Sequence, residues 1–427
     1  NTIMVGITGI GSGIDIDSIV KALVDSEKAP KTSQLDRLEK TTTTRISALG
    51  TLTGALNTFK SSIDALNKTS LFEARTASSS NSSVLKVTAA TTAPSGSYSV
   101  QVQQLATSSK VALQSVAGGS SATFNSGTLN ISTTSNNFSV QITAENNTLA
   151  GMRDAINEAG KDSGVSATII TDASGSRLVL SSSKTGAGKD IQVGVTENGV
   201  TTGGNALTSQ SFVPVVDPGN ADAFLQPSSD TGAAGVISKA KSAKVTVDGL
   251  QLVRDTNRIE DALDGVTLDL VSAQSSADQL DGKTISVTVG VDKTGVKANL
   301  QKFVEAYNAL VSTTSQLTGV VSLGEGKQPV TGPLLGDSSI RNVMSGLRNE
   351  MVKITGSDAV RALADLGITT EKDGKLKLDD ERLTAAIDNN FDQIAGYLTG
   401  EDGLMGRLAK SVSGYVATDG VLKQRTE

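Results

Sequence analysis

The side chains that most often carry out chemistry in proteins are missing from this sequence. Among its 427 residues there is no Cys and no His. The chain therefore has no thiolate or imidazole ligand for a metal, and it lacks the commonest general base. Serines are abundant, but no imidazole is present to activate one as a nucleophile. Carboxylates are left as the candidates for binding an ion or moving a proton.

The turn at Asp373-Gly374 is the acidic segment that most resembles a calcium-binding loop. With Gly374 at the sixth position of such a loop, Thr369 would be first and Asp380 twelfth, so the first carboxylate and the final bidentate Glu are both missing. The run Asp379-Asp380-Glu381 is instead typical of a helix N-terminus, where carboxylates accept from free N–H groups. We therefore predict no catalytic, cofactor or metal site, and a protein that is not an enzyme.

Other binding functions find little support. The glycine-rich residues 6–13 have Gly-x-Gly spacing, but they follow no predicted strand and no βαβ unit surrounds them, which argues against nucleotide binding. A net charge of −6 gives no reason to expect a nucleic acid partner. No apolar run approaches the ~20 residues that span a bilayer, so we expect no membrane insertion. Residues 1–13 lack the basic and apolar regions of a cleavable secretion signal.

The strongest pattern is helical and covers residues 35–66. Apolar residues recur there at alternating spacings of three and four, interrupted by Thr42 and Arg45, which predicts a helix about 48 Å long. Residues 296–317 repeat this spacing and are the expected partner. The packing residues predicted for the two helices are Leu49, Leu52, Leu56, Phe59, Ile63, Leu300, Phe303, Tyr307 and Leu310. Periodicity alone leaves open whether they form a coiled coil or two helices of an ordinary bundle.

A second apolar stripe precedes this helix, at Ile16, Ile19, Val20, Leu23 and Val24. Asp15 or Asp17 is expected to cap it, and Pro30 to end it or to start the next helix. The β-branched residues 41–44 have low helix propensity. They predict a weak point between a mobile terminal segment and a firm stalk.

Between the long helices the apolar period changes to the alternation of strands. Thr148 is expected to cap a helix that ends near Gly160, and Asp248-Gly249 marks a tight hairpin turn. We predict a loop at residues 114–137, with Leu129 and Ile131 as possible strand positions, a loop at 213–235 and a turn of helix at 259–263. Strands are predicted at residues 83–89, 98–102, 111–113, 165–170, 177–182, 191–195, 266–270 and 284–289, and residues 245–252 are predicted to form the hairpin that turns at Asp248-Gly249.

These patterns predict an α+β multidomain chain, in which two β-rich domains are inserted into a discontinuous helical stalk, either a coiled coil or a bundle. A terminal leg would comprise residues 1–42 with 417–427, mostly disordered or helical. The stalk would comprise residues 43–72 and 283–416. One β-rich domain would comprise residues 73–115 and 237–282, and the other residues 116–236.

Several groups of residues match one known protein family. They are residues 9–20 with Leu23-Val24 and Lys28-Ala29-Pro30, residues 261–270, residues 299–310, residues 332–337, Leu366-Gly367-Ile368 and Gly374-Lys375-Leu376. On these residues the chain resembles the flagellar filament capping proteins, also called hook-associated protein 2. Residues 148–195 are similar to a small flagellin-type repeat unit.

The resemblance implies a structural cap at the distal end of the bacterial flagellar filament. Such a cap is a ring-shaped homo-oligomer, for which a pentamer is one candidate, and it binds flagellin, promotes its folding and insertion, and prevents its loss. The resemblance also implies a flagellar export chaperone as a partner, and export through the flagellar secretion channel, without a cleavable signal, to the flagellum tip outside the cell. The family continues past Glu427 as a coiled-coil helix. Its terminal helices are legs, which assigns filament binding to Ile14, Ile16, Ile19 and Leu23.

Two other classes compete with the cap. One is another flagellar axial protein, such as a junction protein or flagellin itself, which would polymerise. The other is a secreted β-rich adhesin; adhesion to host glycans is also a secondary role in some members of the resembled family. The motifs at residues 9–17 and 261–270 favour the cap.

Overall fold

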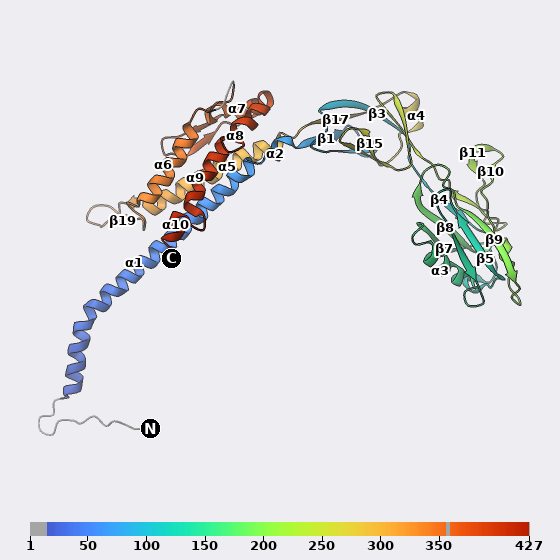
Figure 1. Cartoon of the computed structure of the whole chain (residues 1–427), viewed down its shortest axis with the longest axis horizontal. Helices are drawn as coiled ribbons and strands as arrows, with labels where there is room; N and C mark the ends of the chain where they lie inside the picture. The colour runs from blue at the N-terminus through green and yellow to red at the C-terminus, as the bar shows by residue number, and fades with distance from the viewer. Residues whose placement is uncertain (1–14, 356–358, 427) are drawn as a thin grey trace. The chain divides into compact units, whose positions relative to one another are not determined.

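The computed structural model describes residues 15–355 and 359–426 and divides the chain into two units. One unit comprises Asn1–Ala74 and Asp292–Glu427 and is mainly helical. The other comprises Arg75–Val291 and is mainly β-sheet (Figure 1). The fold thus mixes helices with several sheets, and the β unit is inserted in sequence between the two parts of the helical unit.

The helical unit is built along α1 (Ile16–Leu66). Both α5 (Thr294–Thr318) and α9 (Leu404–Val416) pack against the C-terminal part of α1, and α6 (Ser338–Val352) packs on α9. Its other helices are α2 (Thr69–Glu73), α7 (Asp380–Asn389), α8 (Phe391–Leu398) and α10 (Val421–Gln424). Two small hairpins complete it: β18 (Val320–Val321) with β19 (Val330–Thr331), and β20 (Ile368–Thr370) with β21 (Leu376–Leu378).

The prediction that Pro30 ends a helix or starts the next one was wrong, because α1 continues through Pro30. Proline has no N–H to donate to the carbonyl four residues earlier and costs a helix about 3 kcal/mol relative to alanine. Strong helix formers on both sides, including Lys28, Ala29 and Lys31, favour continuation. The threonine run is helical too, and the hydroxyls of Thr41 and Thr44 donate to the carbonyls of Arg37 and Lys40 at 2.8 Å.

The C-terminal residues are held on the helical unit. Leu422 in α10 is buried, and the Arg425 guanidinium donates to both carboxylate oxygens of Asp337, at 3.0 and 2.7 Å. Asp337 also caps α6 by accepting from the Ser339 N–H. These bonds, with that of Arg425 first in importance, hold the pKa of Asp337 below its ordinary value.

The β unit contains two hydrophobic cores. The first lies between a five-stranded antiparallel sheet of order β1-β17-β3-β13-β14 and a three-stranded sheet of order β15-β16-β2. Its strands are β1 (Arg75–Ser79), β2 (Leu85–Ala89), β3 (Gly96–Gln104), β13 (Ala243–Val247), β14 (Leu250–Arg254), β15 (Arg258–Leu263), β16 (Val266–Leu270) and β17 (Ile285–Val291). The short helix α4 (Ser276–Leu280) precedes β17.

The second core lies among helix α3 (Leu149–Gly160) and two further sheets, of order β12-β4-β8-β7 and β6-β5-β9. Thr148 caps α3 as predicted, accepting from the Gly151 N–H at 3.0 Å. The strands are β4 (Ser108–Ala112), β5 (Ser126–Ser132), β6 (Asn137–Ile142), β7 (Val165–Asp172), β8 (Gly175–Thr185), β9 (Gln192–Gly199) and β12 (Gly235–Ser238).

The predicted hairpin turn at Asp248-Gly249 is confirmed. Both residues have positive φ, 49° and 82°, as a two-residue hairpin turn requires. The Asp248 carboxylate also accepts from the Ser99 N–H at 2.8 Å, which ties the turn to β3.

Two predictions between the helices were wrong, and a third was right only in part. Residues 259–263 lie in strand β15 instead of a helical turn, because pairing with β16 and burial of Ile259 outweigh the local helix propensity of Glu, Ala and Leu. Residues 114–137, predicted as a loop with Leu129 and Ile131 as possible strand positions, contain β5, and both of those residues lie in it. The predicted loop at 213–235 contains the hairpin of β10 (Val216–Asp217) and β11 (Asn220–Phe224). In addition, β17 pairs with β1 and β3, so residues up to Val291 belong to the β unit and not to the stalk.

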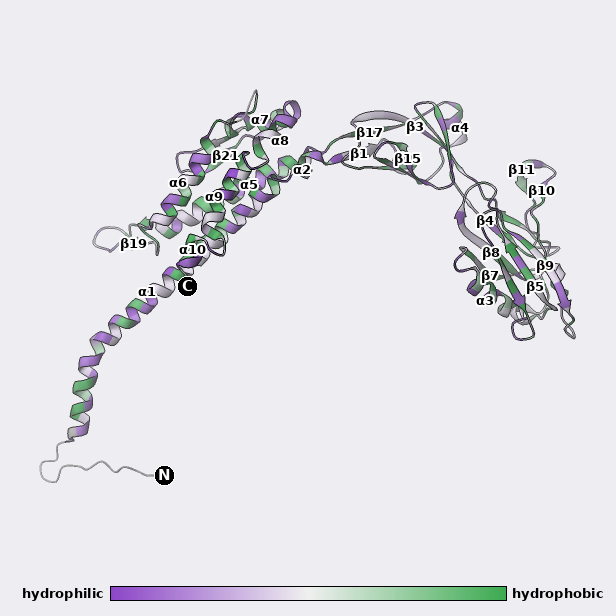
Figure 2. Cartoon of the chain, viewed as in Figure 1, coloured by the Kyte–Doolittle hydropathy of each residue, from purple (hydrophilic) through white to green (hydrophobic). Residues whose placement is uncertain are grey.

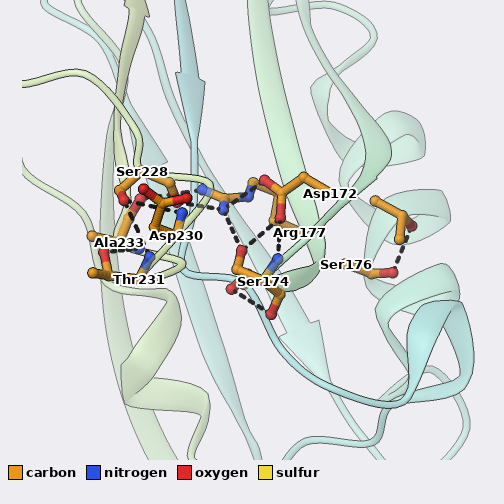
Figure 3. Close-up of polar contacts among 10 residues, drawn as sticks. Asp172, Ser174, Ser176, Arg177, Ser228, Asp230, Thr231 and Ala233 are labelled. Atoms are coloured by element: carbon orange, nitrogen blue, oxygen red, sulfur yellow. Dashed lines mark hydrogen bonds and ion pairs between the residues drawn. The ribbon is translucent and has the colours of Figure 1, made fainter.

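A buried arginine fastens the segment after β11 to the β7–β8 hairpin (Figure 3). The Arg177 side chain is 3% exposed and pairs with the Asp172 carboxylate at 2.8 Å. It also donates to the carbonyls of Ser228 and Ala233 and to the hydroxyl of Ser174. The Ser174 hydroxyl and N–H, together with Arg177, hold the pKa of Asp172 below its ordinary value. Two bonds from this buried side chain reach the segment after β11, which forms little regular structure, and two hold the guanidinium in the β7–β8 hairpin.

Candidate functional site: the exposed arm of helix α1

The N-terminal part of α1 makes no buried contact. Every residue from 17 to 47 is exposed, whereas Ala48 and Leu49 are buried. We call residues 17–47 the arm. Figure 1 shows α1 continuing past the other helices of its unit over this stretch. The arm therefore presents all of its side chains for contact with something other than its own unit.

The arm carries large apolar side chains at helical spacing. Ile19, Leu23, Leu35 and Leu38 are 48%, 64%, 64% and 62% exposed. Val20, Val24 and Ile46 are exposed as well. Figure 2 shows hydrophobic and hydrophilic stretches alternating along this part of α1. One exposed leucine is ordinary on a protein surface, but a stripe of them along one helix is typical of a binding face.

A capped N-terminus precedes the arm. The Asp15 carboxylate accepts from the Ser18 N–H at 3.1 Å, and this bond, with that to the Ser18 hydroxyl, lowers the pKa of Asp15. Asp17 lies in the first turn, where a negative charge interacts favourably with the positive end of the helix dipole. Capping fixes the first turn, but a helix without tertiary contacts is only marginally stable in water. Burial of the apolar stripe against a partner would add the missing stabilisation.

Two of the four predicted leg residues lie in the arm, and the side chains of the other two are outside the described part of the structure. Ile19 and Leu23 are the two in the arm, and both are exposed. Ile16 is the first residue of α1, but its side chain is outside the described part of the structure, and all of Ile14 is outside it.

The residues predicted for stalk packing lie together in the helical unit. All nine, from Leu49 to Leu310, are at most 4% exposed. The ring of Phe59 on α1 lies 5.3 Å from that of Phe303 and 5.5 Å from that of Tyr307, both on α5, measured between centroids. Leu35 and Leu38, which continue the same spacing toward the N-terminus, have no such partner and are exposed.

In residues 15–355 and 359–426 the candidate ligands for a metal ion are acidic side chains, since the chain has no Cys and no His. No cluster of three or more acidic side chains in these ranges is placed to hold a metal ion. The Asp373 carboxylate accepts from the Lys375 N–H and so stabilises its own turn. Within the same described ranges, no helix has both the length and the apolar character needed to cross a membrane.

Sequence reasoning missed two polar ties, Arg177 with Asp172 and Asp337 with Arg425. The first had a weak signal, since Arg177 interrupts an otherwise apolar or small-residue strand that is buried along most of its length. The second joins residues far apart in the sequence, and no local pattern predicts it.

Comparison with known proteins places these features in one family. Residues 12–109 match the model for the flagellar hook-associated protein 2 N-terminus, and residues 240–427 the model for its C-terminus. Residues 128–184 match the flagellin hook IN motif. The B-type flagellar hook-associated protein 2 of Pseudomonas aeruginosa is 48% identical over 99% of this chain and 86% of its own length. The A-type protein of the same species is 40% identical with the same coverage.

A solved structure has a similar fold. The D1-D2-D3 domains of the flagellar cap protein from Escherichia coli superpose with a TM-score of 0.63 at 28% identity. The likeness covers 89% of this chain and 99% of that one. It therefore extends over both units and includes parts of each.

Proposed function

The chain belongs to the flagellar hook-associated protein 2 family, the structural cap proteins of the flagellar filament, and from this premise we propose how it acts. The protein sits at the distal end of the filament, outside the cell, as a ring-shaped homo-oligomer, for which five subunits are the first number to test. It binds flagellin arriving through the channel, promotes its folding and insertion, and prevents its loss. Binding and release are sufficient for this work, so no bond chemistry is required.

The arm of α1 supports this proposal most directly. In our proposal the arm is the leg that contacts the filament, through Ile19 and Leu23 and, beyond the described side chains, Ile14 and Ile16. Its stripe is apolar and uncovered, as a reversible protein-binding helix requires. A segment that becomes fully ordered only on binding gives up part of its affinity for that ordering, which allows the cap to release and rebind as subunits are added.

We further propose a division of labour among the remaining parts. The buried contacts of α1 with α5 form the stalk, either as a coiled coil or as part of a bundle, and the nine packing residues hold it together. The two cores of the β unit correspond to two β-rich domains, one of them carrying the flagellin-type repeat, and together they form the plate of the ring. Export through the flagellar secretion channel, assisted by a chaperone, is compatible with a chain that has no Cys to crosslink in transit.

Complementation in a strain that lacks this protein tests the proposal. Replacing Ile19 and Leu23 by Ser removes the apolar stripe at exposed positions, so folding of both units should be kept. Cells that make this variant should release flagellin monomers into the medium and grow few filaments. The matched control replaces Lys21 and Asp25 by Ser, two exposed polar residues of the same helix segment, and should restore filaments. Normal filaments with the Ile19/Leu23 variant at normal protein levels would contradict the assignment of the leg.

A further inference from the structure

A groove lies between α5 and α6 in the helical unit. Its volume is about 430 Å³. The side chains of Ile340 and Met344, both nearly buried, contribute apolar surface to it, and Leu335, which is 51% exposed, lines it as well. On the α5 side it is lined by Thr314, Ser315 and Thr318. The hydroxyls of Thr314 and Thr318 already donate to carbonyls of α5, so this wall is weakly polar.

Positive charge is concentrated on the α6 side of the groove. Arg341 and Arg348 both line it, both are exposed, and neither forms an ion pair within the part of the chain that the structure describes. They are seven residues apart on α6, or about 10 Å along the helix. The carboxylate that lines the groove, Asp337, is already paired with Arg425. The net charge offered by the groove is therefore positive.

The hairpin of β18 and β19, next to the groove in sequence, also exposes apolar side chains. Thr318 and Leu335, which line the groove, flank the segment that holds β18 and β19. Two hydrogen bonds close the base of this hairpin segment, from the Gly332 N–H to the Gly319 carbonyl and from the Leu334 N–H to the Leu317 carbonyl. The hairpin exposes four large apolar side chains by 50% to 60%: Val320, Val321, Leu323 and Val330. Apolar surface gathered in this way beside a groove is typical of a protein-binding site.

We propose that the groove and hairpin bind an acidic amphipathic helix of another protein. Such a helix would lay its apolar stripe on Ile340, Met344 and Leu335 and place carboxylates about two turns apart opposite Arg341 and Arg348. The arm of a second copy of this chain fits less well. Residues 17–47 contain five acidic and six basic side chains, a net charge of +1, which the two arginines would repel. This inference depends on the helical unit alone and is independent of the cap function.

Fluorescence anisotropy with the whole chain and two synthetic helical peptides tests the proposal. One peptide has leucines at positions i, i+3, i+4 and i+7 with glutamates seven residues apart beside them, and its twin has lysines in place of the glutamates. The glutamate peptide should bind more tightly, and added salt should narrow the difference. Arg341→Glu with Arg348→Glu should weaken its binding by up to about fivefold per arginine and should reverse the preference between the peptides.

Lys302→Glu is the matched control, because Lys302 is an exposed base on α5 that does not line this groove. It changes the net charge of the chain in the same direction and should leave the preference unchanged. Arg341→Gln with Arg348→Gln is a milder pair that should abolish the preference without reversing it. Equal binding of both peptides to the unaltered chain would overturn the proposal, as would an equal loss in the Lys302 variant. A smaller oligomer on sedimentation of the double glutamate variant would also overturn it, because the groove would then be a contact between copies of this chain.

Discussion

Replacement by alanine should destabilise the protein at one leucine of α1 and change its stability little at another, two heptads away on the same face. Leu52 is 0% exposed in the helical unit, whereas Leu38 is 62% exposed in the arm. Leu52→Ala removes buried methyl groups and leaves a cavity in the core of the helical unit. Such a change costs roughly 2–5 kcal/mol of unfolding free energy. Leu38→Ala removes side-chain atoms that are mostly hydrated already. Alanine is also the best helix former, so Leu38→Ala should change the unfolding free energy by less than about 0.5 kcal/mol.

Urea unfolding followed by circular dichroism at 222 nm measures both changes. Most helical residues of the chain lie in the helical unit, so the signal at this wavelength mainly follows its unfolding. Leu56→Ala and Leu35→Ala repeat the comparison at the other apolar position of the heptad, with exposures of 0% and 64%. The midpoint should fall for Leu52→Ala and Leu56→Ala and stay within error for the two arm variants. Equal losses at Leu38 and Leu52 would mean that the arm is packed in the free protein, and the distinction between arm and stalk would be wrong.

Three further perturbations follow from single contacts. Arg177→Met should lower the unfolding free energy of the β unit by about 3 kcal/mol, because the carbonyls of Ser228 and Ala233 lose their buried donor. Urea unfolding followed by the β-sheet signal measures this loss. An unchanged midpoint would mean that Arg177 is not essential to the fold. The lowered pKa of Asp337 stabilises the folded state at pH values above the ordinary carboxyl range, and this stabilisation is lost as the pH falls through the folded-state pKa. The difference in urea midpoint between the natural protein and Asp337→Asn should therefore disappear on acidification. A difference that does not change with pH would refute the contribution of the charge. Pro30→Ala should restore a hydrogen-bond donor to α1, so the ellipticity at 222 nm should become more negative while the urea midpoint of the helical unit stays unchanged. No gain in helix signal would mean that the arm is not helical in solution.

The sequence was most informative where one residue determines local geometry. Thr148 was expected as a helix cap and is one, and Asp248-Gly249 was expected as a tight turn and is one. In each case the side chain or the backbone conformation acts within a few residues, so no distant contact is needed to make the prediction. Strands such as β7 and β8 were also found, because their hairpin is local.

The sequence failed where distant contacts decide. Residues 258–263 contain good helix formers, yet they form a strand because β16 is available for pairing and Ile259 can enter the core. Leu35 and Leu38 show the same spacing as Leu49 and Leu52, but only the second pair is buried. Periodicity marks a face that can be buried without indicating whether the partner belongs to the same chain. The same limit applies to Arg177, whose partners at residues 228–233 lie in a segment without periodicity.

Binding of the purified protein to the ends of flagellin filaments is the most direct test of the proposed role of the arm. Burial of a side chain such as Ile19 or Leu23 contributes about 1.5–3 kcal/mol, so Ile19→Ser with Leu23→Ser should weaken binding by roughly a hundredfold or more. The midpoint of urea unfolding should match that of the unaltered chain, because both residues are exposed in it. The Lys21→Ser, Asp25→Ser variant should bind filament ends normally. Unchanged binding by the Ile19/Leu23 variant would contradict the account, since the filament would then be held by some other surface.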